Sequence, residues 1–557
     1  MTTRDAVYSD DPTGYGGRRV SIVDEGVTRL PPELDGAGNV EYKLQWRLAE
    51  GNGRAVYVIG VHDDGDVVGI TDQELQHTIA TLRAMAQKLD STRVVSVRTR
   101  VLADQENRVV AEVHLAQQTT LPQAELRIAV LGDHGAGKSS ILGCLTYGEA
   151  DDGRGKARLN LLRHRHELES GRTSSIALGT VGFSADGRMQ NYANNRSAEH
   201  IHQRSCHIAT FIDTCGHAKH LKTTARAITG YSPHAFCVVI AADAGTVSAA
   251  TRGYLQMAAA LSMPLVVVVS KMDIAEKTGF AALMHDLLAT LDAVVPGRSK
   301  CMVADAAAPG PLAGDMMDLS VVPIVTTSAV RSVGFDELAS VLRGSLAQCQ
   351  KGGPAGGGIH RCDGPFEFHI ESVHSIDKVG LVATGWVSGG TAKSGTALGQ
   401  PLVVGPDASG GFVGVDVTSI HTLRIPTATA RAGLSAALAI QPHSALSIQK
   451  GMVVLDADQV DAHGRCVSGE FTAAVTLLGP EASAAQTVTV HIRSTCHLAH
   501  VLSVTRAPQG ETSADSSDAT VRLQLDGGTR DYICPGVPIV ARDGRGLVFA
   551  GRVTSAQ

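Results

Sequence analysis

A glycine-rich segment that ends in a lysine and a serine could bind phosphate. It reads GDHGAGKS from Gly132 to Ser139 and matches the pattern G-x-x-x-x-G-K-[ST]. Glycines let backbone N–H groups surround phosphate oxygens, Lys138 can reach the β- and γ-phosphates, and the Ser139 hydroxyl can ligate Mg²⁺. A chance match is the alternative, but a predicted strand precedes the segment and a predicted helix follows it. The predicted phosphate-binding residues are Asp133, His134, Gly135, Ala136, Gly137, Lys138, Ser139 and Ser140.

A second motif, D-x-x-G, lies at the end of a predicted strand at residues 207–213. The Asp213 carboxylate can hold Mg²⁺ through a water molecule, and the Gly216 N–H can contact the γ-phosphate. This tetrapeptide is common and usually forms a turn, so its weight comes from its position at a strand end, after the phosphate-binding segment. Between the two motifs, Thr173 is a candidate second hydroxyl ligand of Mg²⁺, although an isolated threonine is by default a surface residue.

A third motif could recognise a nucleobase. The run SKMD, residues 270–273, follows the apolar segment PLVVVV. A carboxylate at Asp273 can accept from N1–H and the exocyclic amine of guanine, whereas adenine offers no such pair of donors on that edge. An ordinary helix start is the alternative. Four sequence motifs in the right order at strand ends reduce its probability to about one in a hundred. The predicted GTP- or GDP-binding residues outside the phosphate segment are Gly216, Ser270, Lys271, Asp273, Ser328, Ala329 and Val330.

Basic side chains cluster between the first two motifs. Five of them, Arg154, Lys156, Arg158, Arg163 and Arg165, lie within residues 154–166. Such a charge run is usually a solvated face, but it can also contact RNA phosphates. Because the chain carries a net charge of −6, any RNA contact must be local.

The composition is that of a globular protein. Of the 557 residues, 43% are hydrophobic and 19% are charged, which suits several packed cores. The ten cysteines contain no C-x-x-C pair, which favours reduced thiols over a disulfide or zinc framework. The N-terminus lacks the apolar run of a signal peptide, and no apolar segment is long enough to span a membrane. We expect a cytoplasmic protein that binds neither membranes nor DNA.

An α/β domain must position the three motifs. Between residues 123 and 350 strands alternate with helices, which predicts βαβ units and a mostly parallel sheet flanked by helices, a P-loop G domain. One helix should begin at Lys138, where its dipole faces the phosphates. The predicted strands cover residues 126–131, 207–213, 235–241, 264–270 and 321–327.

The regions on either side of this domain differ in pattern. Residues 1–38 lack periodicity and are predicted to be disordered. Residues 39–122 predict a small α+β N-terminal domain, with one helix capped by Thr71 and Glu74. Its predicted strands cover residues 41–48, 54–61, 93–101 and 108–115.

The C-terminal part is rich in short β-runs. A flexible linker is predicted at residues 351–361, followed by two antiparallel β-barrels at residues 362–460 and 461–557, because Gly, Asp and Ser turns separate the runs. Residues 509–519 are predicted to form a long exposed loop in the second barrel.

The ordered set of motifs resembles the translational GTPases, the family of elongation factor Tu, in which a histidine such as His217 follows D-x-x-G. The chain is similar more narrowly to the GTP-binding protein one and two subfamily over about residues 40–555. The strings that carry this similarity lie at residues 41–44, 57–61, 148–149, 152–155, 163–164, 166–167, 169–175, 221–224 and 450–453.

The resemblance implies a G domain followed by two β-barrels, and the conversion of GTP and water to GDP and phosphate. Lys138 and Thr173 would stabilise the transferred charge, while His217 would orient the attacking water. The implied partners are the ribosome and tRNA, with RNA-surveillance or rescue factors, in elongation, ribosome rescue or RNA quality control. A GTP-binding scaffold with little or no hydrolysis is one alternative. An ATP-driven P-loop enzyme is another, against which Asp273 argues.

The chain departs from this family at several positions. His134 and Gly135 replace a usual Val and Asp, and that Asp helps to bind a monovalent cation, a role that Asp133 could take over. Ser270 replaces Asn or Thr, which predicts a weaker tie between the base loop and the phosphate loop. Arg172 stands where elongation factors carry an apolar gate residue, although this subfamily shows Arg as well.

Overall fold

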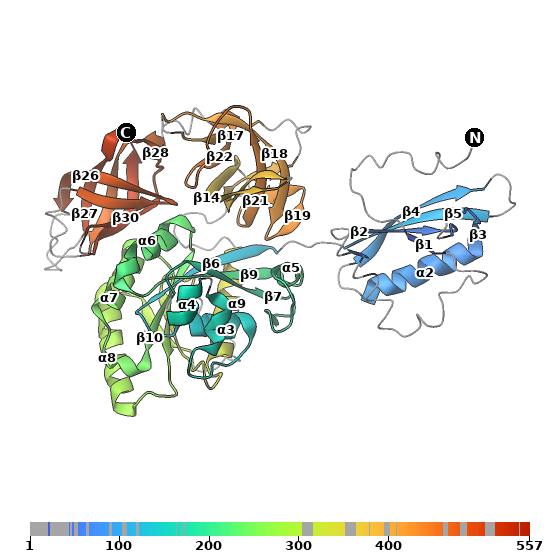
Figure 1. The fold of residues 1–557 in the computed structure, drawn as a ribbon. Coiled ribbons are helices and arrows are strands. Elements are labelled where there is room, and N and C mark those ends of the chain that lie inside the picture. Colours follow the sequence, from blue (N-terminus) through green and yellow to red (C-terminus); the bar gives the residue numbers. More distant parts are fainter. Residues whose placement is uncertain are drawn as a thin grey trace. The chain divides into compact units, whose positions relative to one another are not determined.

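The protein is described by a computed structural model that contains two compact units. The units span Met1–Thr120 and Leu121–Gln557 (Figure 1). Among the residues that the structure describes, no helix is both long and apolar enough to cross a bilayer. The described residues are 20–22, 44, 47–48, 54–62, 66–88, 92–102, 108–117, 122–162, 164–170, 173–303, 316–350, 364–377, 379–394, 401–407, 409–459, 466–478, 487–506, 518–544 and 546–556.

The first unit is an α+β fold in which one helix covers a sheet. Helix α2 (Asp72–Lys88) packs Leu75, Ile79 and Leu82 into the core beside the sheet. The predicted capping box is confirmed, because the Thr71 N–H donates to Glu74 Oε2 at 2.9 Å and the Glu74 N–H donates to Thr71 Oγ1 at 3.4 Å. The strands are β1 (Val20–Ile22), β2 (Arg54–Ile59), β3 (Ile70–Thr71), β4 (Thr92–Val101) and β5 (Arg108–Gln117).

Two predictions for this unit are wrong. The alternation in residues 41–48 predicts a strand, but Leu44, Arg47 and Leu48 are helical. Leu44 and Leu48 are 0% and 4% exposed, and a spacing of four residues places both on one face of a helix. Strand β1, which pairs in parallel with β2, lies inside the 1–38 segment that is predicted to be disordered. The other residues of that segment, and the predicted linker at 351–361, lie outside the described residues.

The second unit begins with an eight-stranded sheet in the order β12-β13-β11-β10-β6-β9-β7-β8. The strands from β12 to β9 run parallel, and β7 is antiparallel to β9. The predicted α/β class is confirmed, although the sequence did not indicate β7, β8 or β12. The strands are β6 (Ala124–Gly132), β7 (Ala177–Phe183), β8 (Met189–Gln190), β9 (His207–Asp213), β10 (Ala235–Ala241), β11 (Leu265–Ser270), β12 (Ser299–Met302) and β13 (Val321–Thr326).

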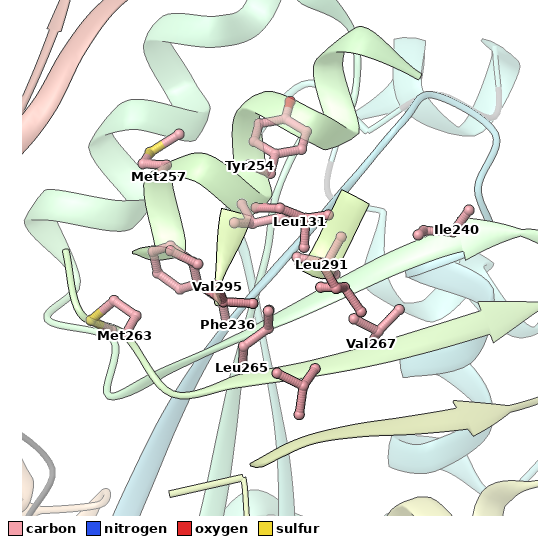
Figure 2. Close-up of a cluster of buried hydrophobic side chains, with 14 of the residues drawn as sticks. Leu131, Phe236, Ile240, Tyr254, Met257, Met263, Leu265, Val267, Leu291 and Val295 are labelled. Carbon is pink, nitrogen blue, oxygen red and sulfur yellow. The ribbon is translucent and has the colours of Figure 1, made fainter. Parts of the chain in front are cut away.

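Helices pack on both faces of this sheet. Because side chains alternate along a strand, Leu131 of β6 enters a core with α7 and α8, while Val130 enters a second core with α3 and α9. Figure 2 shows the first core, with Tyr254 and Leu291 near the sheet. The helices are α3 (Lys138–Tyr147), α4 (Arg165–Ser170), α5 (Ala198–Gln203), α6 (Leu221–Gly230), α7 (Ala249–Ala260), α8 (Lys277–Val294) and α9 (Phe335–Gln350), with 3-10 turns η3 (Lys156–Leu161), η4 (Ala218–His220) and η5 (Ala242–Ala244).

Two antiparallel barrels follow, as predicted. The first closes because β17 pairs with both β18 and β22. Its strands are β14 (Glu367–Ile376), β15 (Gly380–Gly389), β17 (Leu402–Gly405), β18 (Val413–Thr422), β21 (Ser435–Pro442) and β22 (Val453–Asp456), with β19 (Ile425–Thr427) beside β18 and the separate pair β16 (Thr391–Lys393) and β20 (Thr429–Arg431).

The second barrel is closed in the order β24-β27-β26-β25-β29-β30. The loop predicted at 509–519 is wrong at Asp518 and Ala519, which begin β27, and residues 509–517 lie outside the described part of the chain. The strands are β24 (Glu470–Leu477), β25 (Thr487–Ile492), β26 (Thr495–Arg506), β27 (Asp518–Leu525), β29 (Pro538–Arg542) and β30 (Leu547–Ala556), with the short pair β23 (Val467–Ser468) and β28 (Asp531–Tyr532) and the turns η7 (Ala457–Gln459) and η9 (Asp526–Gly528).

The start of strand β6 is attached to the first barrel by buried charged groups. Arg127 forms a two-pronged ion pair with Glu371 of β14, and its guanidinium lies 4.7 Å from the ring centroid of Trp386. Glu125 accepts hydrogen bonds from the Ser435 N–H and hydroxyl of β21 at 2.7 Å. Burial alone would lower the pKa of Arg127, but the carboxylates of Glu371 and Glu125 outweigh it and raise that pKa. The barrel is therefore fixed at the end of β6 that lies opposite the phosphate segment.

Candidate nucleotide-binding site

The phosphate segment connects the end of β6 to the start of α3. Gly132 has φ 142°, and a Cβ at this position would lie 2.2 Å from the Val239 carbonyl oxygen, so the turn requires glycine. Lys138 is 6% exposed, and its Nζ donates to the carbonyls of Gly132 and Asp133 at 2.9 Å each. Burial lowers the pKa of Lys138. An anionic ligand would favour the charged form of Lys138, because its negative charge would compensate for the solvation that burial removes.

Three oxygen groups from distant parts of the chain meet beside Lys138. The Ser139 hydroxyl lies 2.9 Å from that of Thr173 and donates to Asp213 Oδ2 at 2.7 Å. The second oxygen, Asp213 Oδ1, is buried and has no hydrogen-bond partner among the described residues. Burial raises the pKa of Asp213 to about 6. Two hydroxyls and a carboxylate with a spare oxygen are the donor set of a hard cation that keeps several waters, so these residues fit Mg²⁺.

The residue after the D-x-x-G motif lies next to this group. A Cβ at Gly216 would lie 2.4 Å from Lys138 Nζ and 2.6 Å from the carbonyl oxygen of Asp133; because the second atom belongs to the backbone, only glycine lets the chain approach so closely. His217 Nδ1 accepts the Lys219 N–H at 3.1 Å, which places the proton of a neutral ring on Nε2. The His217 ring centroid is 5.9 Å from that of His134 in the phosphate segment. A neutral His217 in this arrangement is a hydrogen-bond donor through Nε2.

The base motif is tied to the phosphate segment by Ser270. The Ser270 hydroxyl lies 2.6 Å from the carbonyl of Ala136, so serine retains the tie that the sequence predicts to be weaker. Lys271 has φ 60° and pairs with Asp243 at 3.6 Å. Asp273 Oδ1 accepts the Ser328 hydroxyl at 2.6 Å. Ser328 thus orients the carboxylate that the sequence assigns to the guanine edge.

These segments enclose a cavity of about 570 Å³. Five predicted site residues do not line it. Three of them are hydrogen-bonded to lining residues, namely Ala136, Asp213 and Ser328. Asp133 accepts the Thr251 hydroxyl at 3.3 Å, and His217 directly follows the lining residue Gly216. The predicted residues that line the cavity are His134, Gly135, Gly137, Lys138, Ser139, Ser140, Thr173, Gly216, Ser270, Lys271, Asp273, Ala329 and Val330.

Part of the basic run also faces this cavity. Arg154 and Arg158 line it, whereas Lys156 is exposed and pairs with Glu149 at 3.4 Å. Arg165 is exposed, and Arg163 lies outside the described residues. The basic run that is predicted to contact RNA therefore contains two kinds of residue. Arg154 and Arg158 are placed to contact a ligand in the cavity, whereas Lys156 and Arg165 are exposed.

Two acidic residues that the sequence analysis did not assign to the site organise the loops around it. The Asp151 carboxylate accepts the N–H groups of Gly153, Gly155 and Ala157 at 2.9–3.2 Å, and the Asp151 N–H donates to the Ala329 carbonyl. Glu167 is fully buried beside Thr173. Both residues lie in or next to the strings that carry the family resemblance, and this proximity was the available signal.

The chain matches a known family over the region that contains this site. Residues 124–348 match the family model for the elongation factor Tu GTP binding domain. GTP-binding protein 2 from Mus musculus and from Homo sapiens are each 36% identical over 448 residues, which cover 76% of this chain and 72% of the relative. GTP-binding protein 1 from Xenopus laevis is 31% identical over 459 residues, which cover 81% of this chain and 67% of the relative.

Solved structures share the fold of the chain. Translation elongation factor SelB from Methanococcus maripaludis, in complex with the GTP analogue GppNHp, has a TM-score of 0.53 at 15% identity, with 79% of this chain and 80% of SelB covered. The GTPase-like domain of Ski7 from S. cerevisiae, bound to GTP, has a TM-score of 0.55 at 12% identity, with 78% and 98% covered. From its sequence relatives, the chain belongs to the family of GTP-binding proteins 1 and 2, within the translational GTPases.

Proposed function

We propose that this protein binds GTP and GDP with Mg²⁺ in the cavity described above and hydrolyses GTP to GDP and phosphate. The convergence of Ser139, Thr173 and Asp213 carries the proposal, because these residues are remote in sequence yet form one oxygen donor set beside a buried lysine. Asp273, in the same cavity, supplies the acceptor that guanine requires.

The residues divide the chemistry among them. Lys138 and the backbone N–H groups of the phosphate segment bind the phosphates and stabilise charge on the transferred group. Ser139 and Thr173 would hold Mg²⁺ directly and Asp213 through water, and the bound cation would neutralise the developing charge. His217 donates to the attacking water through Nε2 and holds it in line with the bond that breaks. The water oxygen bonds to the γ-phosphorus as the bond between that phosphorus and the β,γ-bridging oxygen breaks. GDP leaves with the bridging oxygen, and one proton of the water ends on the phosphate that is released.

Nucleotide turnover tests this proposal. The purified chain is incubated with GTP or ATP, with and without ribosomes, and released phosphate is measured. We expect turnover of GTP that ribosomes accelerate, and no turnover of ATP. GTP binding without turnover under all conditions would support the scaffold alternative, and equal use of ATP would contradict the role of Asp273.

We further propose ribosomal RNA or tRNA as the partner, acting in the cytoplasm. Within the second unit, basic groups from three parts of the chain lie close enough to affect one another. Burial together with Arg542, Lys222 and Arg226 lowers the pKa of His491 to about 4, and burial together with Arg226 and Lys222 lowers that of Lys450. Arg226 Nε is buried and has no hydrogen-bond partner among the described residues. RNA phosphates would relieve this concentration of positive charge.

The salt dependence of RNA binding tests the partner. Two triple alanine variants are compared, one at Lys222, Arg226 and Lys450, and one at Lys156, Arg163 and Arg165. Each lost phosphate contact should reduce the slope of log affinity against log salt by about one unit. Lys277→Ala, at the exposed start of α8, is the control. Unchanged slopes in both triple variants would contradict an RNA partner at these surfaces.

A further inference from the structure

A single buried carboxylate holds together the loop that carries Thr173. Glu167, in the short helix α4, is 0% exposed. Its Oε1 accepts the N–H and hydroxyl of Ser174 at 2.6 and 2.7 Å and those of Ser175 at 2.8 and 3.0 Å. Its Oε2 accepts the His164 N–H at 3.2 Å. These hydrogen bonds from described residues to one side chain fix two stretches of backbone relative to each other.

The two stretches have different tasks. Ser174 directly follows Thr173, whose hydroxyl lies 2.9 Å from that of Ser139 in the predicted Mg²⁺ site. His164 lies within the basic run that is predicted to contact RNA. A ligand that moves either stretch must therefore move the other or break bonds to Glu167.

The charge of Glu167 also acts on the predicted Mg²⁺ site. Glu167 lies near the buried Asp213 carboxylate, whose pKa it helps to raise. Two buried carboxylates near each other destabilise the fold unless a cation compensates them. The positive charge of Lys138 contributes to that compensation, and the donor set beside Asp213 fits a second cation.

We infer that Glu167 is a positioning residue that sets Thr173 for Mg²⁺ and couples it to the basic run, so that RNA contact and nucleotide state affect each other. The inference rests on the proposed GTP and Mg²⁺ binding. Residues that hold a metal ligand in place are often nearly as important as the ligand, and their loss costs about 10–100-fold in metal affinity or activity.

Two measurements that do not depend on turnover test this role. The first is the Mg²⁺ concentration that gives half-maximal binding of a non-hydrolysable GTP analogue. The second is the rate of trypsin cleavage in the basic run, with the analogue or with GDP bound. In Glu167→Gln we expect a Mg²⁺ requirement about tenfold higher. We also expect trypsin to cleave the variant with the analogue bound as fast as it cleaves the parent with GDP bound.

Glu149→Gln is the matched control, because it removes the same charge from the same connection between α3 and β7, but Glu149 is exposed and its contact among the described residues is a surface pair with Lys156. It should behave as the parent does. Circular dichroism checks that each variant is folded. If Glu167→Gln does not fold, the double variant Ser174→Ala/Ser175→Ala removes the two hydroxyl donors and should shift both measurements in the same direction by a smaller factor.

The outcomes separate the two proposals. A parent protein that does not bind the GTP analogue with Mg²⁺ would overturn the proposed function and this inference with it. A parent that binds the analogue, next to a folded Glu167→Gln variant with the parent's Mg²⁺ requirement and trypsin protection, would overturn the inference alone.

Discussion

The two ends of strand β6 hold buried charged groups in different states. At the start of the strand, each charge has an opposite charge beside it: both oxygens of Glu371 contact Arg127, and Arg127 Nε, which has no hydrogen bond among the described residues, lies 3.5 Å from Glu125 Oε1. Glu125 also accepts from Ser435 and Thr210. At the other end, Asp213 Oδ1, on the neighbouring strand β9, has no hydrogen-bond partner among the described residues. Buried polar atoms normally find partners, so the second end is shaped for groups that the chain itself does not supply.

This difference assigns the start of β6 to the stability of the fold and its other end to function. The network at the start of β6 attaches the first barrel to the sheet, and removal of one partner would leave a buried charge uncompensated. At the other end, the buried Asp213 oxygen without a hydrogen-bond partner costs stability, and a bound cation would offset that cost. Mutations at the two ends should therefore change different measurements.

The largest effect is expected on turnover, from His217→Ala. Ribosome-stimulated GTP hydrolysis should slow by about 10²–10⁴-fold, equivalent to about 3–5 kcal/mol, because the water loses the group that positions it. GTP affinity should stay near that of the parent, since His217 does not line the cavity. Single-turnover hydrolysis and a binding titration measure the two quantities.

His285→Ala removes an exposed histidine from α8 and serves as the control, with rates expected to equal the parent's. A His217→Ala protein that hydrolyses GTP at the parent's stimulated rate would assign His217 a purely structural role. A loss of GTP affinity equal to the loss of rate would place it among the binding residues.

A similarly large effect, on stability instead of turnover, is expected from Glu371→Ala. The free energy of unfolding should fall by about 3–5 kcal/mol, because Arg127 stays buried without its partner. GTP affinity of the folded protein should be unchanged. Denaturant unfolding gives the first quantity and titration gives the second.

The exposed pair of Glu470 and Arg522 provides the comparison, and Glu470→Ala should cost less than about 1 kcal/mol. The double variant Arg127→Met/Glu371→Leu should recover most of the lost stability. If Glu371→Ala weakens GTP binding as strongly as it weakens the fold, the two ends of β6 are coupled and the separation fails.

The smallest effect is expected from Ser270→Ala. This change removes the 2.6 Å contact with the Ala136 carbonyl, one neutral hydrogen bond worth about 1 kcal/mol, so GTP affinity should fall by about fivefold. Ser299→Ala, at an exposed position of β12, should leave the affinity unchanged. Equal affinities for Ser270→Ala and the parent would show that the tie does not support the base loop.

The sequence alone was sufficient to predict the parts of the site whose residues lie within a few positions of one another. The phosphate segment, the D-x-x-G motif and the base motif each place their key residues within a few positions at the end of an apolar strand, and parallel strands bring such ends to one edge of a sheet. Lys138, Ser139 and Asp213 could therefore be predicted to meet before their contacts were known, whereas Thr173 lies outside these motifs and was a candidate only from its position between two of them.

The sequence was insufficient where tertiary context decides. Strand β7 reads ALGTVGF, and its two glycines weaken the local signal, but pairing with β9 makes it a strand. Leu44 and Leu48 fit both a strand and a helix, and their burial on one side selects the helix. The role of Glu167 depends on full burial, which its motif does not reveal.

The central claim is that the cavity next to Asp273 binds guanine nucleotides. Binding of GTP and of xanthosine triphosphate to the parent and to Asp273→Asn tests it most directly, with Asp292→Asn at an exposed position as control. Asparagine offers a donor where guanine also presents donors, while xanthine presents an acceptor. We predict that Asp273→Asn binds GTP about ten- to a hundredfold more weakly and prefers xanthosine triphosphate. Unchanged GTP affinity and no gain for xanthosine triphosphate would contradict the assignment of this cavity.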